Sequence, residues 1–571
     1  MTETSPQNST PNVDNDYQSW SHTQLVDRVV ELEQKLKAQA EAYNPRRARD
    51  SKKPSKIERQ YKKIKSKPNT FDPSRYNTRL IALKFAYLGQ RYNGYEHHTG
   101  NDTPLPTIEE VLWQALIKTK LICPQKRDGA STPQSTPGRY EVDVNWDGCE
   151  YSKCGRTDKG VSAFGQVIGI RVRSNRPMEK DKGVNTGITE SSSQTNLQQQ
   201  DLQTNDNVEP EIPFDPVGDE IPYVQMLNRV LPPDVRILAW CPNPPLNFSA
   251  RFHCRERRYK YFFTQPAYNP IPGGTADSSR PMHGHLSISA MREAAHHLVG
   301  CHDFRNLCKI DASKQITNWK RRIFHADIEE IGSLPDPSYV QGPSAHADTP
   351  KLYAIVVHGS AFLWHQIRHI ASILFLIGQG IETPDLVPQL LDITVNPRKP
   401  SYEMAPDAPL VLWDCIFPAP LESEQESGNR EHSEQAHEDS LEWIHMNNQS
   451  AVNATDSRGK WGSGGIVEDL WKVWRRSKMD EILAAQLLDK GATVVANAPY
   501  DTATGGNDTQ RRRTTLIFDG GDFAKKIGTY TPVMDKVRQE SVEVQNAKYR
   551  ERRILTGKRI YGKPAEDTAE E

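Results

Sequence analysis

Alternating apolar and polar positions mark the stretch KCGRTDKGVSAFGQVIGIRVR, residues 153–173, as a loop that leads into a strand. Ile168, Ile170 and Val172 fall on one face of the alternation, and arginines fall on the other face. A period of two is that of a β-strand with one buried face. The pattern therefore places Asp158, which lies in a run of Gly, Arg, Thr and Lys, on a loop at the mouth of a strand.

Further strand and helix patterns surround this loop. Residues 80–89 read as a strand, and residues 107–121 read as a helix in which Thr107 and Glu110 form a capping box. Together with the strand after Asp158 they predict an α/β unit. A second unit is predicted from strands at 257–264 and 352–359, a helix at 287–300 and an apolar helix after residue 359.

Polar segments divide the chain into five parts. We expect a polar and basic N-terminal extension with one short helix (1–70), an N-terminal lobe with the Asp158 loop (71–240), a C-terminal lobe (241–420), an acidic linker with one helix (421–510) and a basic, helix-prone C-terminal extension (511–571). Polar inserts at about 124–138, 174–213 and 334–350 are interpreted as surface loops or disorder.

Charge is informative only in its distribution, because the formal net charge is -1. Residues 46–67 hold 11 basic and 2 acidic side chains, whereas residues 422–442 hold 8 acidic side chains and one arginine. The basic segment suits non-specific RNA affinity or nuclear import, and a merely solvated charge run is an equal alternative.

Eight cysteines without a CxxC pair favour reduced thiols in an intracellular protein and give no zinc framework. The most apolar helix pattern, residues 361–378, contains two His, a Gln and an Arg, so it is too short and too polar for a membrane span. The HQIRH motif, 365–369, has the histidine spacing of a zinc-protease helix but lacks the glutamate, so no metal is predicted there.

Arg368 lies on this apolar helix. A buried arginine needs a carboxylate partner, so some acid is expected beside it. An internal ion pair with any acid, or an arginine that reaches solvent, remains open.

Tyr259, Tyr261 and Phe263 share one face of a strand among arginines. Aromatic side chains interleaved with arginines suit a stacked base beside a phosphate backbone, and ordinary sheet core is an equal alternative.

The 14-residue run CGRTDKGVSAFGQV resembles the signature of the TruA-type pseudouridine synthases. Four further segments resemble the same family in the same order, so that the similarity extends over about residues 71–417: NFSARFHCRERRYKYFF, GCHDFRNLCK, GSAFLWHQIRHIASILFLIGQG and APLVLWDC. The phrases ALKFAYLG, LNRVLPPDVRILAW and FLIGQGIETP are most similar to the eukaryotic subgroup that modifies positions 38 and 39 of the tRNA anticodon arm.

The resemblance implies roles for four residues. Asp158 matches the catalytic aspartate, and Arg156 matches the arginine two positions before it. Tyr259 matches the active-site tyrosine, and Arg368 matches the arginine that pairs with the aspartate. These three side chains are expected to bind the substrate, while Asp158 acts on the uridine.

The resemblance also implies a fold and partners. We expect a two-lobed α+β pseudouridine synthase fold, with a mixed or antiparallel sheet, flanking helices and a basic RNA-binding cleft. The implied protein is an isomerase without cofactor or metal that binds tRNA, forms a homodimer and works in nucleus and cytoplasm. Activity on other RNAs and a non-catalytic RNA-binding or RNA-folding protein are the alternatives, and Asp158 argues against the last because a binder needs no acid near phosphates.

Overall fold

The computed structural model describes residues 21, 23, 28–31, 34–35, 71–98, 103–124, 144–178, 214–270, 281, 283–333, 350–418, 438–445, 466–496 and 515–556. The chain forms two compact units, Met1–Pro73 and Ser74–Glu571. In the first unit residues 28–31 are helical, and Glu31 pairs with Arg28 and Lys35 at helical spacing. Among the described helices, none has the length and apolar character to cross a bilayer.

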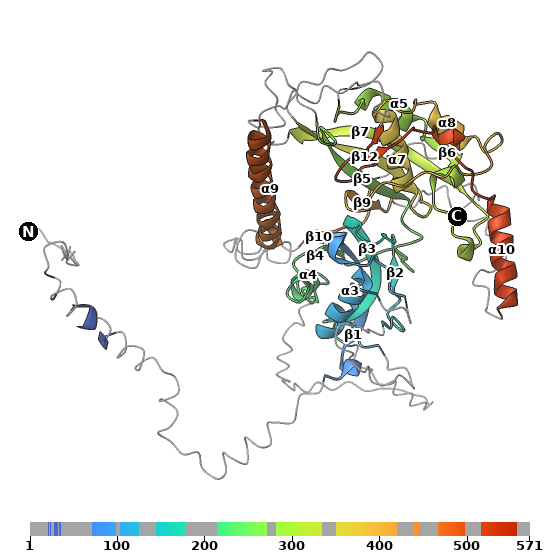
Figure 1. Ribbon diagram of the computed structural model, residues 1–571. Helices are drawn as coiled ribbons and strands as arrows, with labels where there is room; N and C mark the ends of the chain where they lie inside the picture. Colours follow the sequence, from blue (N-terminus) through green and yellow to red (C-terminus); the bar gives the residue numbers. More distant parts are fainter. Residues whose placement is uncertain are drawn as a thin grey trace, which may run out of the picture. The chain divides into compact units, whose positions relative to one another are not determined.

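One mixed sheet of ten strands organises the second unit (Figure 1). Its strands are β1 (Asn77–Tyr87), β2 (Ser152–Lys153), β3 (Ser162–Ser174), β4 (Val235–Cys241), β5 (Glu256–Gln265), β6 (Gly300–Asp303), β7 (Lys320–Ser333), β8 (Lys351–Gly359), β9 (Leu410–Ile416) and β10 (Ile444–His445). They run in the order β10-β4-β1-β3-β9-β5-β8-β7-β6, with β2 paired to β3. The mixed sheet with its helices confirms the predicted fold class.

The pairing of β3 with β9 joins the two halves of the sheet. This pair is parallel, through Ser162 opposite Val411 and Ala163 opposite Leu412, whereas the other described strand pairs are antiparallel. Both contacts lie at the beginning of β3, just after the Asp158 loop. The loop is therefore placed where the two halves meet.

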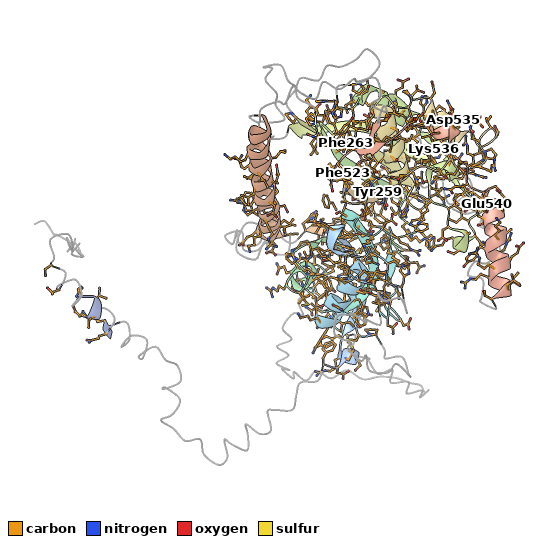
Figure 2. All side chains as sticks on the ribbon, viewed as in Figure 1. Tyr259, Phe263, Phe523, Asp535, Lys536 and Glu540 are labelled. Carbon is orange, nitrogen blue, oxygen red and sulfur yellow. The ribbon has the colours of Figure 1, made fainter. Side chains whose placement is uncertain are left out.

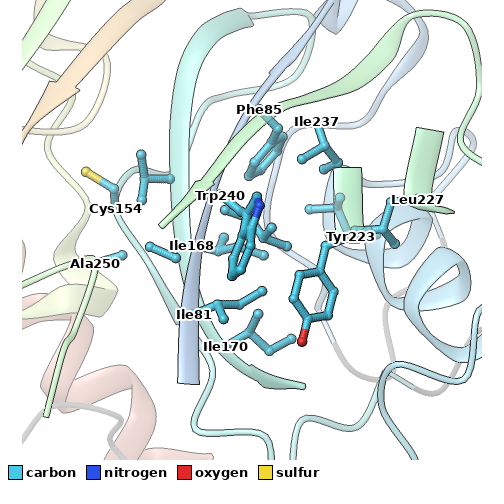
Figure 3. Close-up of a cluster of buried hydrophobic side chains, with 14 of the residues drawn as sticks. Ile81, Phe85, Cys154, Ile168, Ile170, Tyr223, Leu227, Ile237, Trp240 and Ala250 are labelled. Atoms are coloured by element: carbon cyan, nitrogen blue, oxygen red, sulfur yellow. The ribbon is translucent and has the colours of Figure 1, made fainter. Parts of the chain in front are cut away.

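The first core contains apolar side chains of β1, β3 and β4 together with α3 (Ile108–Lys118) and α4 (Tyr223–Asn228) (Figure 3). The predicted capping box of α3 is confirmed: Thr107 N donates to Glu110 Oε2 (2.9 Å), and Glu110 N donates to Thr107 Oγ1 (3.3 Å). These bonds satisfy backbone groups that a helix start leaves unpaired.

The second core contains side chains of β5, β7 and β8 with α5 (Ile288–His296), α7 (Gln366–Gly378) and α8 (Leu386–Leu391). Helix α7 is the apolar helix expected after residue 359, and of its residues only Arg368 is not fully buried. Strand β7 was not predicted, because its KRRIFHADIEEIGS sequence begins with three basic residues and contains four charged or polar residues in its second half.

The C-terminal segment completes this second core. Its hairpin pairs β11 (Thr515–Ile517) with β12 (Lys525–Ile527). Phe518 and Val533 are buried in this core, and the Phe518 ring packs edge-on against Phe375 of α7. The Gln379 side chain accepts from Phe518 N (2.7 Å) and donates to Phe518 O (2.8 Å), which fixes the segment to the end of α7.

Two more helices lie where the sequence pattern predicts them, α9 (Ile466–Ala496) and α10 (Val542–Leu555). Several predicted segments fall outside the described residues: 46–67, most of the three polar inserts, and 419–437 of the acidic segment. The five-part division at residues 70, 240, 420 and 510 stays a prediction.

Candidate active site

A buried glutamine on β3 shapes the loop that carries Asp158. Gln166 is fully buried, its Oε1 accepts from Gly155 N (3.1 Å), and its Nε2 donates to Gly155 O (3.0 Å). Further along the loop, the Thr157 hydroxyl lies 2.7 Å from the Tyr87 hydroxyl, and Tyr95 N donates to Thr157 O (3.1 Å). Backbone and side-chain bonds therefore hold the residues of the loop that directly precede Asp158.

Two glycines permit this conformation. Gly160 has φ +80°, a left-handed value that side chains rarely adopt, and the turn is closed by Val161 N donating to Asp158 O (3.2 Å). Gly94 has φ +87°, and a Cβ there would lie 3.2 Å from the backbone of Asp158. Both positions favour glycine because of the left-handed φ, and at Gly94 the backbone of the Asp158 loop also leaves no room for a side chain.

The Asp158 carboxylate is held from the segment that leads into α7. The Trp364 indole Nε1 donates to Asp158 Oδ1 (3.2 Å), and His365 Nε2 lies 3.4 Å from Asp158 Oδ2. The Asp158 side chain keeps 26% of its surface exposed, so a ligand can still reach it. Each of the two carboxylate oxygens thus has its own nitrogen partner. The two contacts together fix the plane of the Asp158 carboxylate.

His365 adopts an unusual backbone conformation at this point. It is the N-cap residue of α7 with φ 60° and ψ 14°, in the left-handed region that costs a non-glycine residue of the order of 1–3 kcal/mol. Its side chain is 8% exposed, and its Nδ1 has no hydrogen-bond partner within the described part of the chain. The strain places the imidazole against Asp158.

Arg368 is half-buried in the first turn of α7. Its Nε donates to Ala405 O (2.7 Å), and Ala405 N donates back to Arg368 O (3.1 Å). Among the described contacts, the expected ion pair between Arg368 and Asp158 is not formed. The reason is that the guanidinium is anchored to the Ala405 backbone while Trp364 and His365 take the carboxylate.

Tyr259 lies on β5, on the same strand as Phe263 (Figure 2). Its ring meets Phe362 edge-on, with centroids 5.1 Å apart. Burial, with smaller contributions from Cys415 and Asp158, raises the pKa of Tyr259 well above its usual value. Tyr259 is therefore a neutral phenol beside the Asp158 loop, able to donate a proton or stack against a base.

Tyr261, two residues further on the same face, has a different setting. It is fully buried, and its hydroxyl donates to Gly520 O (3.3 Å). Its ring also packs edge-on against Phe375 of α7. Of the two alternatives for this aromatic face, sheet core therefore describes Tyr261, whereas Tyr259 borders the site.

Arg156 is the outermost of the predicted site residues. Its side chain is 50% exposed and its Nε lies 3.3 Å from Glu96 Oε2. Glu96 also pairs with Lys153 (3.1 Å). An exposed pair of this kind contributes only about 0–1 kcal/mol, so Arg156 can exchange Glu96 for another anion at small cost.

The second histidine of the HQIRH motif is committed elsewhere. His369 Nε2 lies 3.0 Å from the buried Nζ of Lys399, and burial lowers the pKa of His369 to about 2. A lysine ammonium at this distance excludes a metal ion between the two histidines of the motif. The described residues that do satisfy the spacing of a metal site are three cysteines, Cys154, Cys254 and Cys415.

Sequence patterns did not single out Trp364, Gln166 or the contact of His365 with Asp158. Trp364 and His365 stand directly before α7 in the segment GSAFLWHQIRH. Their closeness in sequence to Arg368 was the signal that could have pointed to them. Gln166 lies in the 14-residue signature itself.

Comparison with known proteins gives consistent matches. A family model described as tRNA pseudouridine synthase matches residues 294–418. The tRNA pseudouridine(38/39) synthase of Saccharomyces cerevisiae is 35% identical over 94% of this chain and 92% of its own. The human protein of that name is 36% identical over 91% of this chain and 85% of its own.

A more distant relative shows how much of the chain is shared more widely. The tRNA pseudouridine synthase A of Methanothrix thermoacetophila is 28% identical over 59% of this chain and 83% of its own. The similarity over nearly the whole length, and the Asp158 loop placed between the two halves of a mixed sheet, lead to one conclusion: this chain belongs to the tRNA pseudouridine synthase family.

Proposed function

We propose that this chain converts uridine to pseudouridine at positions 38 and 39 in the anticodon arm of tRNA. The observation that carries the proposal is the Asp158 carboxylate, which is partly exposed at the junction of the two sheet halves and held by Trp364 and His365. The names of the relatives, tRNA pseudouridine(38/39) synthase, supply the substrate and the positions.

The reaction explains why a carboxylate is needed. The bond from N1 of the base to C1′ of the ribose breaks, the uracil turns, and a bond from C5 to C1′ forms. C5 then loses its proton, and N1 gains one. Composition and oxidation state do not change, so the reaction needs no redox partner. An ionised Asp158 attacks the sugar or base, or removes a proton from the sugar, and the nitrogens on its two oxygens keep it in one orientation.

The target uridine must leave its stack to reach this carboxylate, at a cost of a few kcal/mol, roughly the cost of flipping a base. Tyr259 offers a neutral aromatic ring at the site for the flipped base. Base stacking on an aromatic side chain contributes about 1–3 kcal/mol, which is of the size of that cost.

Basic side chains beside the site suit the phosphates of the tRNA. Arg156 is half-exposed, Lys159 follows Asp158 directly and is exposed, and Lys309 Nζ lies 4.2 Å from the centre of the Trp364 ring. We assign phosphate contacts to these three residues, which would form part of a basic cleft. We also propose that the chain forms a homodimer, which doubles the surface available to one tRNA.

The proposal is tested in cells that lack this protein. Pseudouridine is mapped in their tRNA before and after the wild-type chain, Asp158→Asn or Asp522→Asn is supplied. Asp522 is exposed on the C-terminal segment, so its variant removes an equal surface charge outside the Asp158 loop. Restoration at positions 38 and 39 by the wild type and Asp522→Asn, but not by Asp158→Asn, is the expected result. Full restoration by Asp158→Asn would reject the catalytic role of Asp158. Pseudouridine restored only at other RNA positions would reject the proposed substrate.

A further inference from the structure

Three cysteines far apart in the sequence meet behind the catalytic loop. Cys154 directly precedes the GRTD run, Cys254 lies two residues before β5, and Cys415 lies on β9. All three are buried, and their sulfur atoms all lie within 4.8 Å of one another. Figure 3 shows Cys154 at the edge of the drawn core cluster.

The surrounding backbone holds the three residues in place. Cys154 N donates to Val167 O (3.0 Å), and Cys415 is the register partner of Arg257 between β9 and β5. The Cys254 thiol donates to Glu256 O (3.3 Å). The sulfurs therefore project from three differently anchored pieces of backbone into one space.

A fixed positive charge accompanies the thiols. Arg257 donates through Nη2 to Cys154 O (3.3 Å) and through Nη1 to Cys254 O (3.4 Å), and its other bonds are to the carbonyls of Arg251 and Ser360. In these contacts the guanidinium meets carbonyl oxygens and no carboxylate. Its charge is thus available to balance negative sulfur atoms nearby.

The thiols respond to each other and to this charge. Burial raises the pKa of Cys154 and of Cys415. Burial alone would also raise the pKa of Cys254, but its hydrogen bonds with the two other thiols and the Arg257 charge lower it.

We propose that Cys154, Cys254 and Cys415 form a binding site for one thiophilic metal ion. Soft thiolate ligands select Cu(I) and Zn(II). Three sulfurs alone suit a three-coordinate Cu(I), whereas structural Zn(II) takes four ligands. Binding replaces the thiol protons, so up to three protons leave as three metal–sulfur bonds form, and the Arg257 charge offsets part of the excess negative charge.

The proposed metal site lies where it would connect separate elements of the fold. A bound ion would join the start of the catalytic loop to β5 and β9, on both sides of the junction between the sheet halves. The ion would stabilise the chain at a point four residues before Asp158, and it would take no part in the uridine reaction.

The five other cysteines supply matched controls. Cys308 is fully buried but outside the cluster, and Cys123 and Cys301 are exposed. Cys308→Ala therefore removes a buried thiol without touching the proposed site. Alanine variants of the three cluster cysteines remove one ligand each and leave a small apolar side chain.

The test uses the full chain, reduced and stripped of metal under nitrogen. Cd(II) is added with the ultraviolet absorption of cadmium–thiolate bonds as the readout, Zn(II) is added in competition, and Cu(I) is supplied from a coloured chelator complex. We expect one equivalent to bind, and each cluster variant to lose affinity by more than the roughly 10–100-fold that follows loss of an outer partner of a metal ligand. Cys308→Ala should bind as the wild type does.

A second readout keeps the test decisive if a variant fails to fold. In urea below the unfolding transition, the bound ion should slow alkylation of the three cluster cysteines in the wild-type chain and leave Cys123 and Cys301 unchanged. Absence of stoichiometric binding with all three ions, or binding that Cys308→Ala weakens as much as the cluster variants do, would overturn the proposal. Binding of Zn(II) but not Cu(I) would still support a thiophilic site and would assign it a fourth ligand.

Discussion

Trp364 Nε1 donates a hydrogen bond to Asp158 Oδ1 over 3.2 Å, and the next residue, His365, lies 3.4 Å from the other oxygen. The Asp158 loop and the start of α7 are thereby connected at the carboxylate itself. Lys309 Nζ lies 4.2 Å from the centre of the Trp364 ring, and Lys309 N donates to Trp364 O (2.9 Å), which fixes the indole from behind. The carboxylate is oriented before any RNA arrives.

Trp364→Phe should slow the reaction more than it weakens tRNA binding. The change keeps an aromatic ring under Lys309 but removes the N–H that reaches Asp158. A hydrogen bond to a charged group contributes about 1.5–3 kcal/mol, so we expect about a 10- to 150-fold loss in the single-turnover rate. Trp413→Phe, an exposed tryptophan on β9, is the control. Equal rates for the wild type and Trp364→Phe would show that the indole does not orient Asp158.

Tyr259→Leu and Tyr261→Leu should fail in different ways. Tyr259 borders the site, so its loss should reduce turnover by the roughly 1–3 kcal/mol of a base stack, or more if its phenol also donates a proton. Tyr261 is buried and bonded to Gly520 O, so its loss should lower stability by about 1–3 kcal/mol. Single-turnover rates and urea midpoints of both proteins separate these effects. The same pattern of damage in both variants would make the pair structural.

Acid should destabilise the second core through His369. Burial lowers its folded pKa to about 2, below the ordinary value of 6.5 for the unfolded chain. The unfolded chain therefore binds a proton that the folded chain does not, and stability is present above about pH 6.5 and is lost as the pH falls below it. The loss is about 1.4 kcal/mol per pH unit, or about 2 kcal/mol between pH 6.5 and 5.

Urea midpoints at several pH values check this prediction. His369→Gln keeps an acceptor for Lys399 Nζ but cannot titrate, so its stability should fall less steeply with acid than that of the wild type. His296→Gln, at an exposed position of α5, should fall as steeply as the wild type. Identical slopes for His369→Gln and the wild type would show that His369 is protonated in the folded chain.

Local patterns predicted much of the fold. The alternation in β3 and the capping box at Thr107 and Glu110 define their elements within neighbouring residues, and both are confirmed. The packing of Phe518 against α7 was not predictable, because it depends on residues about 140 positions apart that no period relates. The family resemblance, and not periodicity, pointed to Asp158 and Tyr259.

The site also shows which contacts a sequence can predict and which it cannot. A buried helix with Arg368 led to the expectation of a carboxylate partner, but Arg368 Nε donates to the backbone oxygen of Ala405 instead. A carbonyl leaves no trace in the sequence because every residue has one. The cysteine cluster was missed for a related reason: Cys154, Cys254 and Cys415 have no common spacing, and only the sheet brings them together.

The most direct test of the account is a single-turnover assay with Asp158→Asn. The amide keeps the size of the side chain but removes its charge, so the protein should fold, bind tRNA at least as tightly as the wild type and form no pseudouridine. Melting curves and tRNA binding are measured on the same preparation. If Asp158 were only a structural partner of His365, the variant would melt at a lower temperature while its folded fraction stayed active. Measurable pseudouridine formation by well-folded Asp158→Asn protein would contradict the catalytic assignment.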